Sequence, residues 1–239
     1  MRIMLRLAKM DTLRWISHLD TMRTLQKAIR RADLPIALSQ GFNPHQKMSF
    51  AVPLSVGVAS QGEYVELELQ HDMLLQEISS RLNHVLPTNM RVLSVAHLPE
   101  SASALMALVQ ASRYQLLLPQ GDEFLWAEAI AKLLGKTMLV VERRTKSDKL
   151  QDVDIRPGIY ALSLSTVAQG DEQRAVLHAD IATNAKLFVR LTEVLNLLAV
   201  QAGCAPWDVM ESEPERVDMG VYREGSFLSL AELFPGKEG

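Results

Sequence analysis

The sequence contains a single cysteine, Cys204, among its 239 residues. This excludes an internal disulfide, a zinc site of four thiolates and the three-cysteine motif that holds a radical-SAM iron–sulfur cluster. No apolar run reaches the roughly eighteen residues that a membrane-spanning helix requires. The first nine residues alternate charged with apolar side chains, unlike a secretory signal. We therefore expect a cytoplasmic protein with no membrane association and no metal or other cofactor.

Aromatic residues are scarce, at 5%, but 48% of the residues are hydrophobic and 22% are charged. Such a chain can build one large domain or two small ones, which excludes disorder as its main state. The net charge of −3 is unevenly distributed. Residues 1–50 carry nine Lys and Arg against three Asp and Glu, or +6, whereas residues 201–239 carry three against eight, or −5. A local basic patch on an otherwise acidic chain can still bind a polyanion.

Residues 1–98 predict an α+β domain of the ferredoxin-like, split-βαβ type. Alternation of apolar and polar residues predicts the strands, and apolar residues at helical spacing predict the helices. The expected order is a strand at 2–9, a helix from Ser17 to Ala32, a short strand at 35–39, a strand at 63–70, a helix capped by Asp72 and a strand at 90–98. Pro53 disfavours an unbroken strand over 48–58.

The first helix is predicted to have one apolar and one cationic face. Ser17 and Asp20 have the spacing of a capping box, and Pro35 ends the helix. An apolar stripe comprises Leu19, Met22, Leu25, Ile29 and Ala32. On roughly the opposite side, within an arc of about 100°, lie Arg23, Lys27, Arg30 and Arg31.

The remaining chain predicts a linker or connecting helix at 99–112, a second α+β domain at 113–205 and an acidic C-terminal tail at 206–239. The second domain repeats the order of elements of the first in part, so a ferredoxin-like arrangement is an option for it as well. Its expected elements are strands near 114–118, 138–142, 159–165 and 175–181, helices near 123–134 and 184–200, and a loop at 152–158.

Several short motifs resemble those of the radical-SAM-linked proteins, a bacterial family. They are Ile16-Ser17-His18-Leu19-Asp20, Arg30-Arg31-Ala32-Asp33-Leu34-Pro35, Ser39-Gln40-Gly41-Phe42-Asn43-Pro44-His45, Lys47-Met48-Ser49-Phe50 and Val153-Asp154-Ile155-Arg156-Pro157. The resemblance implies an accessory protein that works with a radical-SAM enzyme in RNA or ribosome-related metabolism. Because this chain lacks the cluster-binding cysteines, it would supply recognition, and the radical chemistry would lie in the partner.

The cationic helix face is the first candidate site. Arg23 and Arg30 are about 10 Å apart along the helix axis, a distance over which two guanidinium groups can engage successive phosphates. Lys9, Arg14 and Lys47 would widen the patch. The same face is also compatible with a solvated surface, or with a docking surface for an acidic protein.

The second candidate is the loop from Gly41 to Lys47. Phe42 could stack on a base while Asn43 holds the base edge, and His45 and Lys47 add polar and cationic groups. The alternative is a rigid turn with Phe42 in the core.

His18 and His45 are weak candidates for acid–base catalysis, because imidazole titrates near neutral pH. No nucleophile–base spacing accompanies either histidine, and the cap position gives His18 an ordinary surface role. Asp152, Asp154 and Arg156 predict a polar loop with too few oxygen ligands for Mg²⁺. The sequence therefore favours a non-catalytic RNA-binding accessory protein. The alternatives are a metal-independent ribonuclease and a protein-only scaffold, and the oligomeric state is not indicated.

Overall fold

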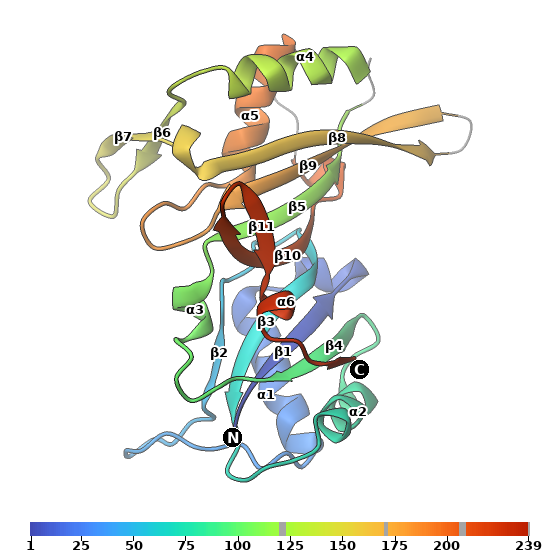
Figure 1. Cartoon of the computed structure of the whole chain (residues 1–239), viewed down its shortest axis with the longest axis vertical. Coiled ribbons are helices and arrows are strands. Elements are labelled where there is room, and N and C mark those ends of the chain that lie inside the picture. Colours follow the sequence, from blue (N-terminus) through green and yellow to red (C-terminus); the bar gives the residue numbers. More distant parts are fainter. Residues whose placement is uncertain (120–122, 170–171, 206–208, 239) are drawn as a thin grey trace. The chain divides into compact units, whose positions relative to one another are not determined.

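The computed structural model describes residues 1–119, 123–169, 172–205 and 209–238 and has an α+β fold. It divides into two compact units, one formed by Met1–Gln110 with Glu215–Gly239 and the other by Ala111–Pro214 (Figure 1). The first unit therefore contains both ends of the chain.

The first unit contains most of the strands and helices that the first 98 residues predict, together with elements contributed by later residues. Its main elements are β1 (Arg2–Lys9), α1 (His18–Arg31), β2 (Met48–Phe50), β3 (Ala59–Glu68), α2 (Leu75–Val85) and β4 (Met90–His97). The others are a 3-10 helix (Asp11–Trp15), α3 (Leu105–Leu108), β10 (Glu215–Arg223), β11 (Ser226–Ser229), α6 (Leu230–Leu233) and β12 (Lys237–Glu238).

The sheet of the first unit has the ferredoxin-like strand order β4-β1-β3-β2, with neighbouring strands antiparallel. The ferredoxin-like prediction is confirmed for this unit. The second predicted strand is displaced, because 35–39 forms only isolated bridges and β2 lies at 48–50. Predicted capping of α2 by Asp72 is wrong: the N-cap position is Leu74, which makes no side-chain capping bond.

One face of this sheet packs against α1 and α2. Ile3, Leu5 and Leu7 alternate along β1 and join Leu25 of α1 and Ile78 of α2 in one hydrophobic cluster. Alternate strand residues point to the same face, so the predicted apolar alternation places this cluster correctly.

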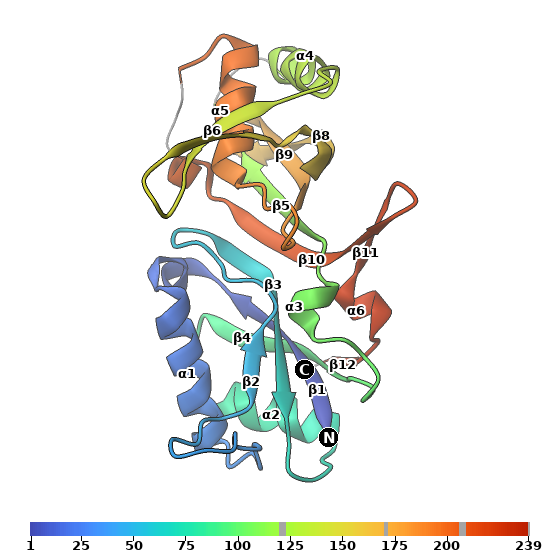
Figure 2. The ribbon, with the colours of Figure 1, turned by 90° about the vertical axis from the view of Figure 1, so that its left-hand side faces the viewer.

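The opposite face of the sheet also contributes to a hydrophobic core. Met4 and Tyr64 pack there in a second cluster with Leu105, Met219 and Leu230. Figure 2 shows α1 on one side of the strands and α3 and α6 on the other. The covering residues are distant in the sequence, so alternation within one strand could not reveal them.

The second unit has an antiparallel sheet in the order β5-β9-β8, flanked by helices that pack against each other. Its elements are β5 (Ala111–Leu117), α4 (Glu123–Leu134), β6 (Val140–Arg144), β7 (Leu150–Asp154), two 3-10 helices (Arg156–Gly158 and Val209–Ser212), β8 (Ile159–Gln169), β9 (Glu172–Ala182) and α5 (Leu191–Ala202). Apart from the β6–β7 hairpin, the order of β5, α4, β8, β9 and α5 matches the first five elements of a split-βαβ domain.

Two predictions for the second unit need correction. Residues 152–154, expected in a loop at 152–158, belong to β7, which pairs with β6 in a hairpin. The helix expected from Asn184 begins at Leu191, because the Asn184 side chain accepts hydrogen bonds from the amides of Lys186 and Leu187 and holds a turn. Gly203 ends α5 in the left-handed conformation.

The C-terminal residues are structured where an acidic tail was expected. From Glu215 onward they form β10, β11, α6 and β12, and of the predicted tail only 206–208 and 239 lie outside the described residues. β11, α6 and β12 have only two to four residues each, too few for a periodic pattern to reveal them. Within the described residues, no helix is long and apolar enough to span a bilayer.

Candidate nucleic-acid interface

Helix α1 orients the cationic residues by burying its other face. Ser17 is the N-cap, and its hydroxyl oxygen accepts the amide of Asp20 at 3.1 Å, as the capping-box spacing predicts. Leu25 and Ile29 are fully buried in the core. Leu19, predicted in the apolar stripe, is instead 56% exposed because it lies in the first turn, at the edge of the core.

The four basic residues of α1, which we call the cationic face, are all exposed: Arg23, Lys27, Arg30 and Arg31. Arg23 approaches Asp20 at 3.5 Å, but both side chains are more than half exposed. An exposed ion pair of this kind contributes about 0–1 kcal/mol to stability, so Arg23 can leave Asp20 and bind another partner at little cost. The other three side chains form no ion pair with the described part of the chain. Most of this positive charge therefore faces water without an internal counter-ion.

The patch does not extend to all the basic residues expected around it. Lys9 is buried, 1% exposed, and its amine lies 3.4 Å from the carbonyl oxygen of Ile16, so its inclusion in the surface is wrong. Lys47 is exposed but forms an ion pair with Glu68 at 2.8 Å. Arg14 is half-buried in the 3-10 helix before α1.

The loop between Ser39 and His45 is closed by its own hydrogen bonds. The Ser39 amide donates to the His45 carbonyl at 2.8 Å, and the His45 amide donates to the Ser39 hydroxyl at 3.1 Å. The His45 Nδ1 atom is within 3.2 Å of the Ser39 hydroxyl and 3.1 Å of the Asn43 carbonyl oxygen. Gly41 has φ +127°, a conformation that L side chains rarely adopt.

Phe42 and Asn43 stand at the outer end of this loop. The Phe42 side chain is fully exposed, and Asn43 is exposed beside it. Phe42 thus lies outside the core, which removes the alternative of a buried anchor. An aromatic ring held in water on a closed loop is available for stacking.

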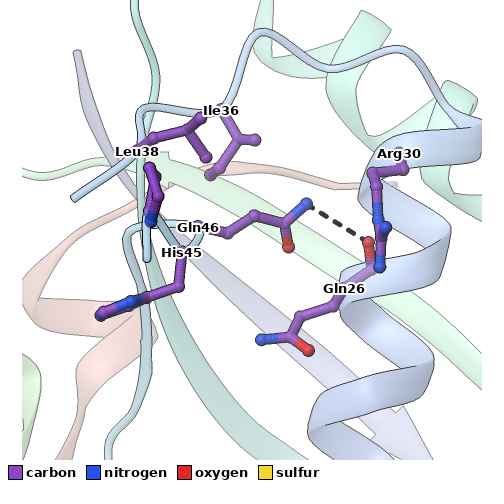
Figure 3. A pocket seen from close by; sticks show the side chains of 7 residues that line it. Gln26, Arg30, Ile36, Leu38, His45 and Gln46 are labelled. Carbon is purple, nitrogen blue, oxygen red and sulfur yellow. Dashed lines mark hydrogen bonds between the residues drawn. The ribbon is translucent and has the colours of Figure 1, made fainter. Parts of the chain in front are cut away.

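A pocket of about 460 Å³ lies between α1 and the segment 36–46 (Figure 3). Arg30 of the cationic face and His45 of the loop both line it, so the structure brings together two residues from separate motifs. Gln26 and Gln46 also line the pocket, and the sequence analysis missed both. Gln26 lies four residues before Arg30, on the same side of α1, and that spacing was the available signal.

The two histidines lie far apart. His18 begins α1, and its ring contacts the Phe50 ring edge-on at a centroid distance of 5.0 Å. His45 lies in the loop and lines the pocket together with Arg30. Arg30 follows His18 by twelve residues in α1, which is about 18 Å along the helix axis at 1.5 Å per residue. A single scissile bond cannot be reached by both.

The Asp154-Ile155-Arg156 part of the second-unit motif has a structural role. The Asp154 carboxylate accepts the amides of Leu139 and Arg156 at 2.8 and 3.0 Å. The Arg156 guanidinium donates to backbone carbonyls, among them that of Leu134, the last residue of α4, at 2.9 Å. These bonds tie the hairpin to the end of the helix. Within the described ranges, no group of three or more His, Cys, Asp or Glu side chains could hold a metal ion.

The sequence matches one protein family over most of its length. The family model described as "Uncharacterized protein conserved in bacteria (DUF2344)" matches residues 2–190. The chain belongs to this family. The DUF2344 match includes α1, the loop and every residue that lines the pocket, and it ends before β10. No curated protein matches the sequence.

A chain in the structure titled "Crystal Structure of a Cbf5-Nop10-Gar1 Complex" is similar in fold, with a TM-score of 0.51 and 10% sequence identity. The similarity covers 93% of this DUF2344 chain and 50% of that chain. This chain thus spans about half the length of its structural neighbour. At this identity, the likeness shows an α+β fold of related arrangement and nothing about activity.

Proposed function

We propose that the chain binds single-stranded RNA through the cationic face of α1 and the loop around Phe42. The observation that carries the proposal is the presence of four exposed basic side chains on one helix, three of them without an ion pair in the described part of the chain. Guanidinium and ammonium groups in such an array bind phosphates, and an exposed ring supplies a stacking surface.

The finer proposal is that the protein is a non-catalytic accessory subunit of a radical-SAM enzyme in RNA or ribosome-related metabolism. Its support is the resemblance of the motifs to radical-SAM-linked proteins, together with the single cysteine, which leaves the cluster to a partner. The ribonuclease alternative is less favoured, because His18 at the start of α1 and His45 in the loop beside Arg30 are too far apart to act on one scissile bond.

RNA binding is tested by the salt dependence of affinity. Fluorescence anisotropy with a labelled 12-nucleotide RNA compares the wild type with the quadruple variant Arg23→Glu, Lys27→Glu, Arg30→Glu, Arg31→Glu. The logarithm of wild-type affinity should fall against the logarithm of salt concentration with a slope of roughly 0.7 per neutralised phosphate. The variant should lose most of its affinity and show a shallower slope.

The matched control reverses four exposed lysines of the second unit: Lys132, Lys136, Lys146 and Lys149. It changes the net charge by the same amount and should leave binding much closer to the wild type. Equal affinity and slope in the wild type and the α1 variant would refute the interface. If both variants lost the same affinity, RNA binding would depend on the overall charge of the protein and not on α1.

The partner proposal needs a separate experiment. Tagged protein is recovered from cells after RNase treatment, and the bound proteins are identified by mass spectrometry. We expect an enzyme with the three-cysteine radical-SAM motif. Recovery of that enzyme by a protein that binds no RNA would support the scaffold alternative, and its absence would contradict the accessory role.

A further inference from the structure

The pocket beside α1 contains a buried hydrogen-bond acceptor that no group in the described part of the chain satisfies. The Gln46 side chain reaches from the loop toward the helix, and its Nε2 atom donates to the Gln26 carbonyl oxygen at 3.3 Å (Figure 3). Its Oε1 atom is buried and has no hydrogen-bond partner among the described residues. A buried acceptor left unpaired is unfavourable by about 1–3 kcal/mol, so a ligand that donates to it gains binding energy.

The orientation of the Gln46 amide follows from its neighbour. A backbone carbonyl can only accept, so the amide nitrogen must face Gln26, and Oε1 is left on the pocket side. Figure 3 shows this oxygen directed into the space between the side chains of Gln26 and His45. The acceptor is therefore fixed in direction before any ligand arrives.

The walls of the pocket combine apolar surface with a cation. Ile36, Leu38 and Pro44 contribute carbon surface, and Arg30 contributes a guanidinium. A volume of about 460 Å³ lies within the range of small-molecule pockets, about 300–1,000 Å³. The acceptor is Gln46 Oε1, and the cationic donor is Arg30. Together they complement a flat heterocycle that carries a hydrogen-bond donor next to an acceptor and whose ring packs against the apolar walls.

We propose that this pocket binds one unpaired adenine or cytosine of the RNA, with Gln46 Oε1 accepting from the exocyclic amino group. In both bases the amino group projects from the ring and adjoins an acceptor ring nitrogen, which Arg30 can meet. Uracil is disfavoured because its N3–H lies between two carbonyl oxygens, whose partial negative charge is repelled by the acceptor oxygen of Gln46. The inference rests on the proposed RNA binding and adds base selectivity to it.

The test compares C12 with U12, two pyrimidine oligonucleotides that differ only at the N3 and C4 edge. Wild-type protein should bind C12 about fivefold to tenfold more tightly than U12, as expected for one buried hydrogen bond made or lost. The near-isosteric Gln46→Met variant should bind both with the U12 affinity and keep the wild-type salt slope. Its thermal stability should stay close to that of the wild type, because removal of the unpaired acceptor offsets the loss of the hydrogen bond to the Gln26 carbonyl.

Gln40→Met is the matched control, because Gln40 is an exposed glutamine of the same loop outside the pocket. It should keep the preference for C12. Should Gln46→Met fail to fold, wild-type protein with N4,N4-dimethylcytidine 12-mers gives an independent reading, since the ring is kept and the donor is removed. These oligomers should bind like U12.

The outcomes separate the base pocket from the RNA interface. Salt-dependent binding with equal affinities for C12 and U12 would overturn the pocket and leave the interface standing. A preference for C12 that survives in Gln46→Met, or with the dimethylated base, would also overturn the pocket. If neither oligonucleotide binds, both proposals fail.

Discussion

At the scale of single residues, the first unit buries charge that the sequence does not mark as buried. Arg216 is 0% exposed and Glu63 is 2% exposed, and the guanidinium donates to the carboxylate, with the Nε contact at 3.1 Å, and to the Val52 carbonyl at 3.0 Å. Glu63 and Arg216 are 153 residues apart in the chain. Burial of both charges is tolerated because each has a charged, hydrogen-bonded partner.

His18 lies near this buried pair and responds to it. Burial lowers the pKa of His18 from its usual 6.5, the Glu63 carboxylate opposes this effect, and Arg216 and Lys9 reinforce it. The folded state therefore binds a proton less readily than the unfolded state does. Stability from this residue is present above pH 6.5 and is lost as the pH falls toward the lowered value.

We predict that the free energy of unfolding falls between pH 7.5 and pH 5, and that it falls less in His18→Gln because the substituted side chain does not titrate. Urea denaturation at each pH measures the change. His71→Gln, at an exposed position, controls for the loss of a histidine. An identical pH dependence in His18→Gln and the wild type would contradict the assigned cause.

At the scale of elements, α1 serves the core and the interface at once. The faces are separated because apolar and basic residues recur at helical spacing on opposite sides. If the first turns of α1 lost their helical structure, both its packing in the core and the placement of its basic side chains would be weakened. The N-cap at Ser17 holds the start of the helix, since its hydroxyl also donates to the Asp20 carboxylate at 2.7 Å.

Ser17→Ala should reduce the free energy of unfolding by about 0.5–2 kcal/mol, because the first turn loses its side-chain acceptor. Chemical denaturation followed by circular dichroism measures the loss. Ser17→Asp supplies another good N-cap and should restore most of it. If alanine and aspartate give the same stability, the cap does not contribute.

At the scale of the whole molecule, the last residues of the chain complete the first unit. The Tyr64 hydroxyl of β3 donates to Asp218 at 2.6 Å and lies 3.1 Å from the Ser229 hydroxyl. Burial, and then Asp218, raises the pKa of Tyr64, so its phenol stays protonated and acts as a donor. Leu230 is fully buried in the same cluster.

Leu230→Ala should therefore destabilise the first unit by about 2–5 kcal/mol, the range for a large apolar side chain removed from a packed core. Denaturation monitored by hydrogen exchange of β1 and β3 localises the effect. Val200→Ala, at a 65% exposed position in α5, is the control and should change little. An equally small effect at Leu230 would mean that the C-terminal segment does not complete this core.

The sequence by itself determined the local features of the protein. Short-range periodicity and caps specified α1 with its two faces, the bounds of α4 and the split-βαβ order of the first unit, because these depend on residues a few positions apart. Tertiary structure alone decided the burial of Lys9, the covering of the second sheet face and the meeting of Gln46 with α1. Each depends on segments distant in sequence, whose contacts no local pattern encodes. The candidate site divides in the same way: its charges could be read along one helix, but its pocket exists only where the loop folds back against that helix.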